Sequence, residues 1–369
     1  MTLTRRNISD QRNSQDFERY SEASNISLYD FRKAPKPFHW EGTSKIYQTV
    51  DTHTFPLRYG HQLSRADSNA KVWQAKIQAE RHGFTDNVAV KVVRYGTEKE
   101  QRAAKTEVVH LRKICHNHIV AFLGYYIKMG EEVNHMGILM FPVAALSLEA
   151  FLESPDILLR REMMLPWFGC LTRALEYLHN LPFPIKHRDI KPANILIDKS
   201  DAVFLTDFDT SKEYKSHADA VTSGTDRRYT PRYVSPQMIE EESVQGIWSD
   251  MFCLGCVFLE MATVILCSNR DNLNTYIEEN CGCSPGEIEF HRHYEVAIKY
   301  IQELRKRFQN KPAKPYETCL LNEGLDMISS TIRECAVGDA VSHGVICEVL
   351  DKLPTKPCQS CSNVSFDPT

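Results

Sequence analysis

Hydrophobic and polar positions alternate over much of the first half of the chain. Between about residues 55 and 145, short alternating runs predict strands, which one helix interrupts. Residues 71–79 and 86–93 predict a hairpin, since polar turn residues separate the two runs. In the second run, a period of two places Ala89 and Lys91 on one face and the intervening valines on the other.

The helical pattern becomes dominant further along the chain. Residues 97–115 predict a helix in which Glu107, Leu111 and Ile114 share one side. Beyond residue 146, the apolar spacing predicts a mainly helical region with helices over 148–153, 163–179, 250–266, 289–309 and 323–335. A small strand-rich lobe followed by a larger helical lobe is an α+β arrangement.

The two ends of the chain differ from this central part. Residues 1–50 are polar and predict a disordered or loosely docked arm, and residues 356–369 form a polar tail. The N-terminus shows no apolar signal segment. The apolar run Met251–Leu266 is short for a bilayer span and contains Glu260, so it predicts a buried helix. We therefore expect an intracellular protein, cytoplasmic or nuclear.

Composition narrows the expected partners. The net charge of −4 gives no global attraction to nucleic acid or to an anionic membrane, so neither is expected as a partner. The 12 cysteines are scattered, which favours reduced intracellular thiols over a disulfide framework. The pairs Cys281/Cys283 and Cys358/Cys361 leave two alternatives, a four-thiolate zinc site or ordinary surface thiols.

Four polar residues stand in a pattern that suits phosphoryl transfer. Asp189, Lys191 and Asn194 lie in one predicted loop, and Asp207 follows the next predicted hairpin. Asp189 can accept a hydroxyl proton, and Lys191 can neutralise the charge of a moving phosphoryl group. Asn194 and Asp207 offer the hard oxygen ligands that Mg²⁺ prefers.

The stretch His187-Arg-Asp-Ile-Lys-Pro-Ala-Asn194, followed by Asp207-Phe208, resembles the eukaryotic protein kinase family. The resemblance covers about residues 55–355. It implies a two-lobed protein kinase fold with a small strand-rich lobe over about 55–143 and a larger helical lobe over about 144–355. It also implies ATP and Mg²⁺ as cofactors and a protein substrate with a Ser or Thr acceptor.

The same resemblance assigns roles to further residues. Lys91, in Val-Ala-Val-Lys, would bind the α and β phosphates, with Glu107 as its helix partner. Met140 would be the gatekeeper, and Phe141 to Val143 would form the hinge that binds adenine through backbone groups. Asp250 would anchor the catalytic loop. The residues implied to enclose the adenine are Val72, Ala89, Leu148 and Leu196, and those of a regulatory stack are Leu111, Phe122, His187 and Phe208.

The segment from Asp207 to Gln237 resembles the activation segment of the family. Lys191 and Thr230 are similar to the residues of serine/threonine kinases rather than tyrosine kinases. Arg188 and Lys212 resemble the basic pocket that receives an activating phosphate. Two alternatives remain for the negative charge: phosphorylation of Thr225, or the standing charge of Asp226.

Several positions depart from the family pattern. Asp209 stands where the family has glycine, and it either tunes Mg²⁺ affinity or is a tolerated substitution. The three positions of the glycine-rich loop hold Arg65, Asp67 and Ala70, which predicts weaker nucleotide binding. These departures keep open a pseudokinase that acts as a binding or allosteric scaffold with little or no catalysis.

A last departure from the family pattern involves two positions that change together. Gln237 replaces the family's glutamate, and the stretch Asp339–His343 replaces the arginine that would form a buried ion pair with it. Losing both charges together is nearly neutral, whereas losing one leaves an unpaired buried charge. We expect Gln237 and His343 to meet in a neutral hydrogen bond.

Overall fold

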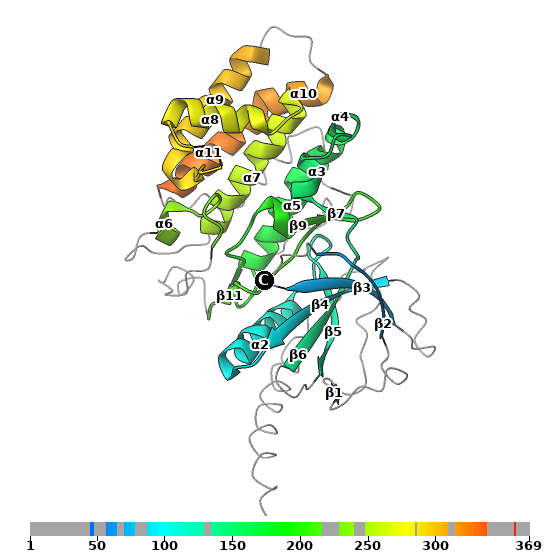
Figure 1. Ribbon diagram of the computed structural model, residues 1–369. Coiled ribbons are helices and arrows are strands. Elements are labelled where there is room, and N and C mark those ends of the chain that lie inside the picture. The colour runs from blue at the N-terminus through cyan, green and yellow to red at the C-terminus, as the bar shows by residue number, and fades with distance from the viewer. Residues whose placement is uncertain are drawn as a thin grey trace, which may run out of the picture. The chain divides into compact units, whose positions relative to one another are not determined.

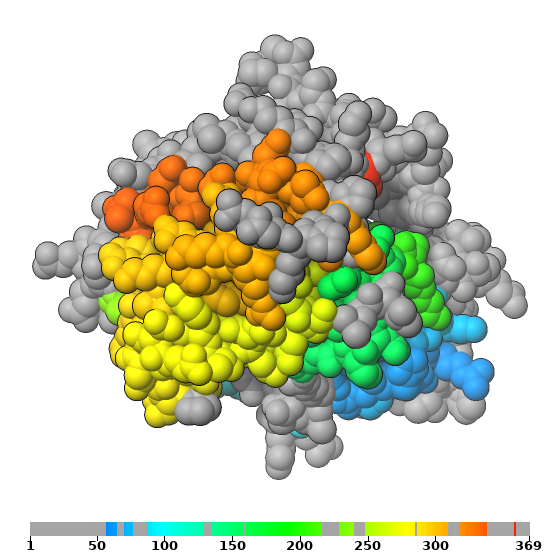
Figure 2. Space-filling view, turned by 90° about the horizontal axis from the view of Figure 1, so that it is seen from above, coloured from blue at the N-terminus to red at the C-terminus, as the bar shows by residue number. Residues whose placement is uncertain are grey.

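The computed structural model describes residues 45–47, 57–64, 70–77, 87–128, 134–215, 229–239, 248–284, 286–308, 314–337 and Cys358. A six-stranded sheet precedes a mainly helical region (Figure 1). Figure 2 shows the yellow to orange helical residues gathered together, with green residues between most of them and the blue residues of the first strands. The expected α+β order of a strand-rich part followed by a helical part is therefore present.

The six-stranded sheet has the order β1-β5-β6-β4-β3-β2. Its strands are β1 (Lys45–Tyr47), β2 (Leu57–Gln62), β3 (Lys71–Ile77), β4 (Asn87–Tyr95), β5 (Ala121–Lys128) and β6 (Asn134–Phe141). All neighbours are antiparallel except β1 and β5. The predicted hairpin is confirmed as β3 and β4, whose register pairs Val72 with Lys91.

Part of the arm predicted to be disordered or loosely docked is docked as strand β1. Residues 45–47 lie within the predicted polar arm of residues 1–50, yet they pair in parallel with residues 126–128 of β5. The edge of a sheet presents unpaired N–H and C=O groups, so even a short polar segment can add a strand there. The rest of the arm lies outside the described residues.

Helix α2 (Glu98–Lys113) crosses beside the sheet and confirms the helix predicted over residues 97–115. Thr97 begins it with a capping box, in which its hydroxyl accepts from the N–H of Glu100 and the Glu100 carboxylate accepts from the N–H of Thr97. Glu107 and Leu111 are buried on its inner side. The helix therefore brings one carboxylate into the apolar interior under the sheet.

The helical region is built around α7, which is buried along almost its whole length. The helices after the large sheet are α3 (Leu148–Leu152), α4 (Ile157–Arg160), α5 (Leu165–His179), α6 (Pro236–Ile239), α7 (Trp248–Cys267), α8 (Asp271–Cys281), α9 (Phe290–Phe308), α10 (Pro315–Cys319) and α11 (Leu325–Ala336). Among the described residues, α7 alone is long and apolar enough to cross a membrane, but nearly all of that stretch is buried inside the protein. This burial is typical of a core helix and confirms the prediction for Met251–Leu266.

Two small sheets position the polar residues singled out in the sequence. One has the order β10-β9-β7 and the other pairs β11 with β8. Their strands are β7 (Leu146–Ser147), β8 (Ile185–Lys186), β9 (Ile195–Ile197), β10 (Val203–Leu205) and β11 (Lys212–Glu213). The loop from β8 to β9 carries Asp189, Lys191 and Asn194, and Asp207 follows β10.

Candidate active site

Asp250 of α7 holds the loop between β8 and β9. Its carboxylate accepts from the backbone N–H of His187 and of Arg188, both at 2.8 Å, and lies 2.9 Å from Nε2 of His179. Burial alone would raise the pKa of Asp250, but the hydrogen bonds and nearby histidines lower it to about 2. The anchoring role predicted for Asp250 is confirmed by these contacts.

The hydrogen bonds to Asp250 hold Arg188 in an unusual backbone conformation. Its φ of 69° lies in the left-handed region, which a residue with a Cβ adopts at a cost of roughly 1–3 kcal/mol. The hydrogen bond from its N–H to Asp250 opposes this strain. The bend that results turns the chain immediately before Asp189.

The Asp189 carboxylate is oriented by three side chains. Nδ2 of Asn194 donates to Oδ2 at 2.8 Å and to the Asp189 carbonyl at 2.9 Å. Nζ of Lys191 lies 2.7 Å from Oδ2. The Thr230 hydroxyl donates to Oδ1 at 2.8 Å and accepts from Lys191 at 2.7 Å. Asp189 therefore already accepts a hydroxyl hydrogen beside a positive charge.

Lys91 links the sheet to both acidic residues predicted around it. Its Nζ lies 2.8 Å from Oε1 of Glu107 and 2.5 Å from Oδ1 of Asp207. Burial would lower the pKa of Lys91, but the carboxylates of Glu107, Asp207 and Asp209 together raise it. Burial also raises the pKa of Glu107, whereas Lys91 lowers that of Asp207 against the effect of burial. Lys91 is thus a fixed cation shared by α2 and the segment after β10.

Asp209 lies in a turn after Asp207 and is half-buried. Among the described residues, the non-glycine positions with positive φ are Arg188, Asp201, Asp207 and Ser268. Asp209 therefore has a backbone conformation that does not require glycine, which explains why its Cβ is accommodated. Its charge still acts on Lys91 and Glu107.

The donor set of Asn194 and Asp207 fits a hard divalent cation. The N–H of Thr206 donates to the carbonyl of Asn194 at 3.1 Å, so Asn194 and Asp207 lie at the same end of the β9–β10 hairpin. The Asp207 carboxylate keeps about a third of its surface exposed while it contacts Lys91. Amide and carboxylate oxygens are the ligands that suit Mg²⁺.

The residues expected around adenine lie on adjacent strands. Ala89 of β4 pairs with Met140 of β6, and both are buried. Val72 and Leu196 are half-buried, as are Phe141 and Val143 in the segment after β6. Leu148 is fully buried in α3, so it presents no surface to a ligand in this structure.

The loop expected to cover the phosphates lies partly outside the described residues. Arg65 and Asp67 fall there, whereas Ala70 is half-buried in a bend before β3. The base of the loop is closed by Ser64, whose hydroxyl accepts from the N–H of Val72 at 3.1 Å. The N–H of Leu63 donates to the Val72 carbonyl at 2.7 Å. The ends of β2 and β3 are therefore joined without glycine.

The predicted regulatory stack contains a direct ring contact. The rings of His187 and Phe208 lie 4.8 Å apart between centroids, and both residues are fully buried. Leu111 of α2 is also buried, and Phe122 of β5 is half-buried. Phe208 therefore occupies the apolar interior while Asp207, directly before it, contacts Lys91.

The activation segment is described on both sides of a gap. Arg188 donates to the carbonyl of Thr210 at 3.3 Å, and Nζ of Lys212 lies 5.1 Å from the centre of the Tyr214 ring. Both residues thus lie near the start of the segment. Thr225 and Asp226 lie outside the described residues, so the choice between them stays a prediction.

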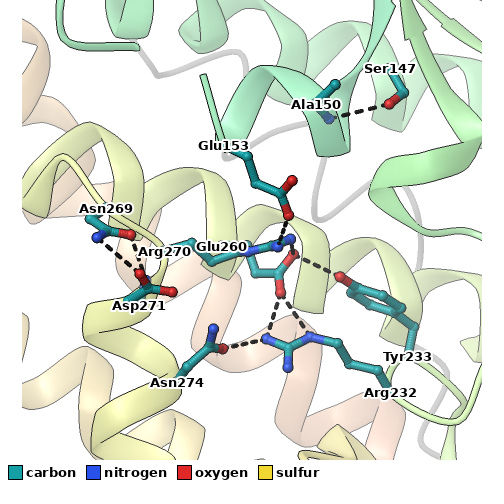
Figure 3. Close-up of polar contacts among 10 residues, drawn as sticks. All are labelled: Ser147, Ala150, Glu153, Arg232, Tyr233, Glu260, Asn269, Arg270, Asp271 and Asn274. Atoms are coloured by element: carbon teal, nitrogen blue, oxygen red, sulfur yellow. Dashed lines mark hydrogen bonds and ion pairs between the residues drawn. The ribbon is translucent and has the colours of Figure 1, made fainter. Parts of the chain in front are cut away.

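A polar network on Glu260 fixes the end of this segment (Figure 3). The fully buried Glu260 of α7 accepts two hydrogen bonds from Arg232, at 3.0 and 2.7 Å, and one from the Tyr233 hydroxyl at 2.9 Å. Arg270 extends the network and pairs with Glu153 at 2.6 Å. Arg232 and Tyr233 follow Thr230 closely in the chain, so the network holds Thr230 against Asp189.

The side chain of Gln237 forms hydrogen bonds to the backbone. Its Nε2 donates to the carbonyls of Cys335 and Ala336, at 2.8 and 2.9 Å. These carbonyls end α11, where helices leave acceptors unpaired. His343 lies outside the described residues, so the proposed Gln237–His343 hydrogen bond stays a prediction.

Sequence reasoning missed the contacts of two residues, Thr230 and His110. Thr230 was singled out only for the choice of acceptor, yet it touches both Asp189 and Lys191. His110 of α2 lies 2.6 Å from the hydroxyl of Ser211, which joins α2 to the segment after Phe208. Each contact joins residues far apart in the chain, and no local spacing signals it.

The structure separates Cys358 from Cys281 and Cys283. Cys281 and Cys283 of the described residues group with His293, whereas Cys358 groups with His118 and Cys170. Cys358 therefore lies in a different part of the fold from Cys281 and Cys283, which disfavours the four-thiolate alternative. Cys361 lies outside the described residues.

The sheet, the helical region, the Lys91–Glu107 pair and the loop of Asp189 together define a two-lobed protein kinase fold. A family model for the protein kinase domain matches residues 70–332. The chain therefore belongs to the eukaryotic protein kinase superfamily, of the serine/threonine type.

Three relatives illustrate this membership. Serine/threonine-protein kinase nekl-2 of Caenorhabditis elegans is 31% identical over 240 residues, covering 62% of this chain and 63% of that protein. Cyclin-dependent kinase 7 of Xenopus laevis is 28% identical, covering 51% of this chain and 52% of that protein. Mitogen-activated protein kinase kinase kinase 3 of Arabidopsis thaliana is 32% identical, covering 45% of this chain and 24% of that protein. The chain thus spans less than two thirds of the length of each of these relatives.

Proposed function

We propose that this chain transfers the γ-phosphoryl group of ATP to a Ser or Thr hydroxyl of a protein, with Mg²⁺ as the metal cofactor. The observation that carries the proposal is the position of Lys91, 2.8 Å from Glu107 and 2.5 Å from Asp207. This contact requires α2 and the segment after β10 to be in place at the same time, as phosphoryl transfer by kinases does.

Each polar residue then has one task. Lys91 binds the α and β phosphates, and the backbone of Phe141 and Val143 binds adenine. Pro142 between them has no N–H, so the hinge donor is the N–H of Val143. Mg²⁺, when bound, neutralises phosphate charge, and the oxygens of Asn194 and Asp207 would hold it.

The transfer itself relies on Asp189 and Lys191. The acceptor oxygen forms a bond to the γ-phosphorus while the bond to the β–γ bridging oxygen breaks. Asp189 takes the hydroxyl proton, and Lys191 stabilises the negative charge of the moving group. The hydrogen bond from Thr230 to Asp189 supports this role, since that carboxylate is oriented toward a hydroxyl.

The test is transfer of labelled phosphate from ATP to the protein itself and to a generic Ser/Thr substrate. We expect Asp189→Asn to lower the rate by about 10²–10⁴-fold, the usual contribution of a general base. Asp156→Asn is the matched control, since Asp156 is exposed and makes no capping hydrogen bond. Equal rates for wild type and Asp189→Asn would contradict the proposal.

A second candidate is a pseudokinase that binds partners without turnover. The absence of glycine at positions 65, 67 and 70 favours it, since backbone groups there approach phosphates less closely. Thermal stabilisation by ATP and Mg²⁺ without phosphate transfer would support this candidate. We further propose a cytoplasmic or nuclear location, on the same grounds of composition as above.

A further inference from the structure

We propose that His118, Cys170 and Cys358 form a zinc site that attaches the C-terminal segment to the kinase fold. The three residues come from distant parts of the chain: the segment before β5, helix α5, and the region beyond α11. Their ligand atoms, Nε2 or Nδ1 and two Sγ atoms, lie within 4.8 Å of one another. Neither phosphoryl transfer nor nucleotide binding uses any of them.

The orientation of His118 suits a metal ligand. Its Nδ1 lies 2.7 Å from the carbonyl of Val203, and because a carbonyl oxygen only accepts, Nδ1 carries the hydrogen. In the neutral ring, Nε2 then presents its lone pair, and it points to Sγ of Cys358 at 3.1 Å. A histidine that ligates a metal usually donates its other N–H to a carbonyl or carboxylate in this way.

The chemistry of the cluster suits a zinc cation, because two thiols and one imidazole nitrogen are ligands that zinc prefers. Binding would release the thiol protons of Cys170 and Cys358, because zinc binds cysteine as thiolate.

The three ligand atoms need to move only slightly closer together to coordinate one ion with tetrahedral geometry. Zinc lies about 2.3 Å from sulfur and about 2.0 Å from histidine nitrogen, which places tetrahedral ligands about 3.5–3.8 Å apart. His118 and Cys170 are buried and Cys358 is half-buried, so solvent reaches the cluster from the side of Cys358. Nitrogen and thiolate ligands together select zinc over Mg²⁺.

The site is linked to the active site through β10. The N–H of Leu205 donates to the His118 carbonyl at 2.8 Å, and the N–H of Val120 donates to the Leu205 carbonyl at 3.0 Å. Strand β10 leads directly to Asp207. An ion held by His118 would therefore brace the strand that positions Asp207, the proposed metal-binding carboxylate.

The experiment measures zinc in the full-length reduced protein and needs no kinase activity. The protein is incubated with zinc, loosely bound metal is removed with a mild chelator, and zinc is measured by mass spectrometry. We expect about one zinc ion per chain in the wild type. Cys358→Ser should weaken zinc affinity by at least about 100-fold, more than changes around a ligand usually do.

Two further variants make the result specific. Cys319→Ser is the matched control, because Cys319 is also half-buried but belongs to neither cysteine–histidine group. It should keep its zinc. His118→Asn should lose zinc, and circular dichroism establishes that each variant is folded. Cobalt in place of zinc should give thiolate charge-transfer absorption in the wild type and lose it in Cys358→Ser.

Three outcomes would overturn the proposal. Wild-type protein that retains no zinc would do so, as would a Cys170–Cys358 disulfide formed in place of metal binding. Zinc that survives in Cys358→Ser but is lost in Cys283→Ser would assign the metal to the group of Cys281, Cys283 and His293 instead.

Discussion

The hydroxyl of Thr230 donates a hydrogen bond of 2.8 Å to the carboxylate of Asp189. Lys191 donates to the same hydroxyl at 2.7 Å and lies 2.7 Å from the Asp189 carboxylate, so these three side chains form a closed polar triangle. The Glu260 network holds the chain that follows Thr230. The activation segment is thereby attached directly to the proposed catalytic base.

This triangle predicts that Thr230 positions Asp189 and Lys191. Hydrogen bonds to charged groups contribute about 1.5–3 kcal/mol, so Thr230→Val should lower the rate of transfer by about 10–100-fold. Thr230→Ser keeps the hydroxyl and should retain most of the rate. The KM for ATP should stay the same, because Thr230 does not contact the nucleotide-binding residues. Steady-state kinetics with all three proteins measures this, and a Thr230→Val variant as fast as wild type would contradict it.

The Lys91–Glu107 pair predicts a non-additive effect on stability. Lys91→Met leaves the buried Glu107 carboxylate without its cation, which should lower the free energy of unfolding by about 3–5 kcal/mol. Adding Glu107→Leu removes that carboxylate and should restore most of the loss. Urea unfolding of both variants measures the effect.

Nucleotide binding should not differ between the same two variants, in contrast to their stability. Both lack Lys91, so neither should be stabilised by ATP and Mg²⁺. A double variant less stable than Lys91→Met would show that the buried pair is not the source of the instability.

The charge of Asp209 predicts a dependence on magnesium concentration. A carboxylate near the proposed metal ligands attracts a divalent cation, so Asp209→Asn should weaken Mg²⁺ affinity on the order of 5-fold. Because the backbone at Asp209 does not require glycine, Asp209→Gly should behave like Asp209→Asn. Titration of transfer activity with Mg²⁺ tests both. Unchanged titrations would identify Asp209 as a tolerated substitution.

His110 predicts a loss of stability in acid. Burial, together with Lys113 and against the effect of Glu213, lowers its pKa from 6.5 to about 4. Between pH 4 and pH 6.5, His110 is therefore protonated in the unfolded chain but neutral in the folded chain. The contribution of neutral His110 to the free energy of unfolding is fully present above pH 6.5. It is lost as the pH falls toward 4, and the loss is on the order of 3 kcal/mol.

Comparison of variants isolates this contribution. His110→Gln can keep a hydrogen bond to Ser211 but does not titrate, so its stability should change less between pH 6.5 and 4 than that of the wild type. Thermal unfolding over this range measures the difference. His61→Gln changes an exposed histidine and is the control. Parallel pH profiles for wild type and His110→Gln would rule out His110 as the source.

The sequence alone determined the elements whose signals are local. The alternating run around Lys91 and the long apolar stretch of α7 each depend on neighbouring residues, so their spacing was sufficient. Helix α8 was missed because its sequence is rich in Asn and Glu, and only Leu273 and Ile277 are buried. Its stability comes from packing against α9, which no local pattern records.

The tertiary structure decided which distant residues meet. The motifs placed Asp189, Lys191 and Asn194 in one loop, but the contact of Thr230 with Asp189 depends on the path of the activation segment. Likewise, Cys358 reaches His118 across the fold, whereas one of the two alternatives from the sequence grouped it with Cys281 and Cys283. Helix and turn signals act over a few residues, but contacts between distant segments are selected by the packing of the whole core.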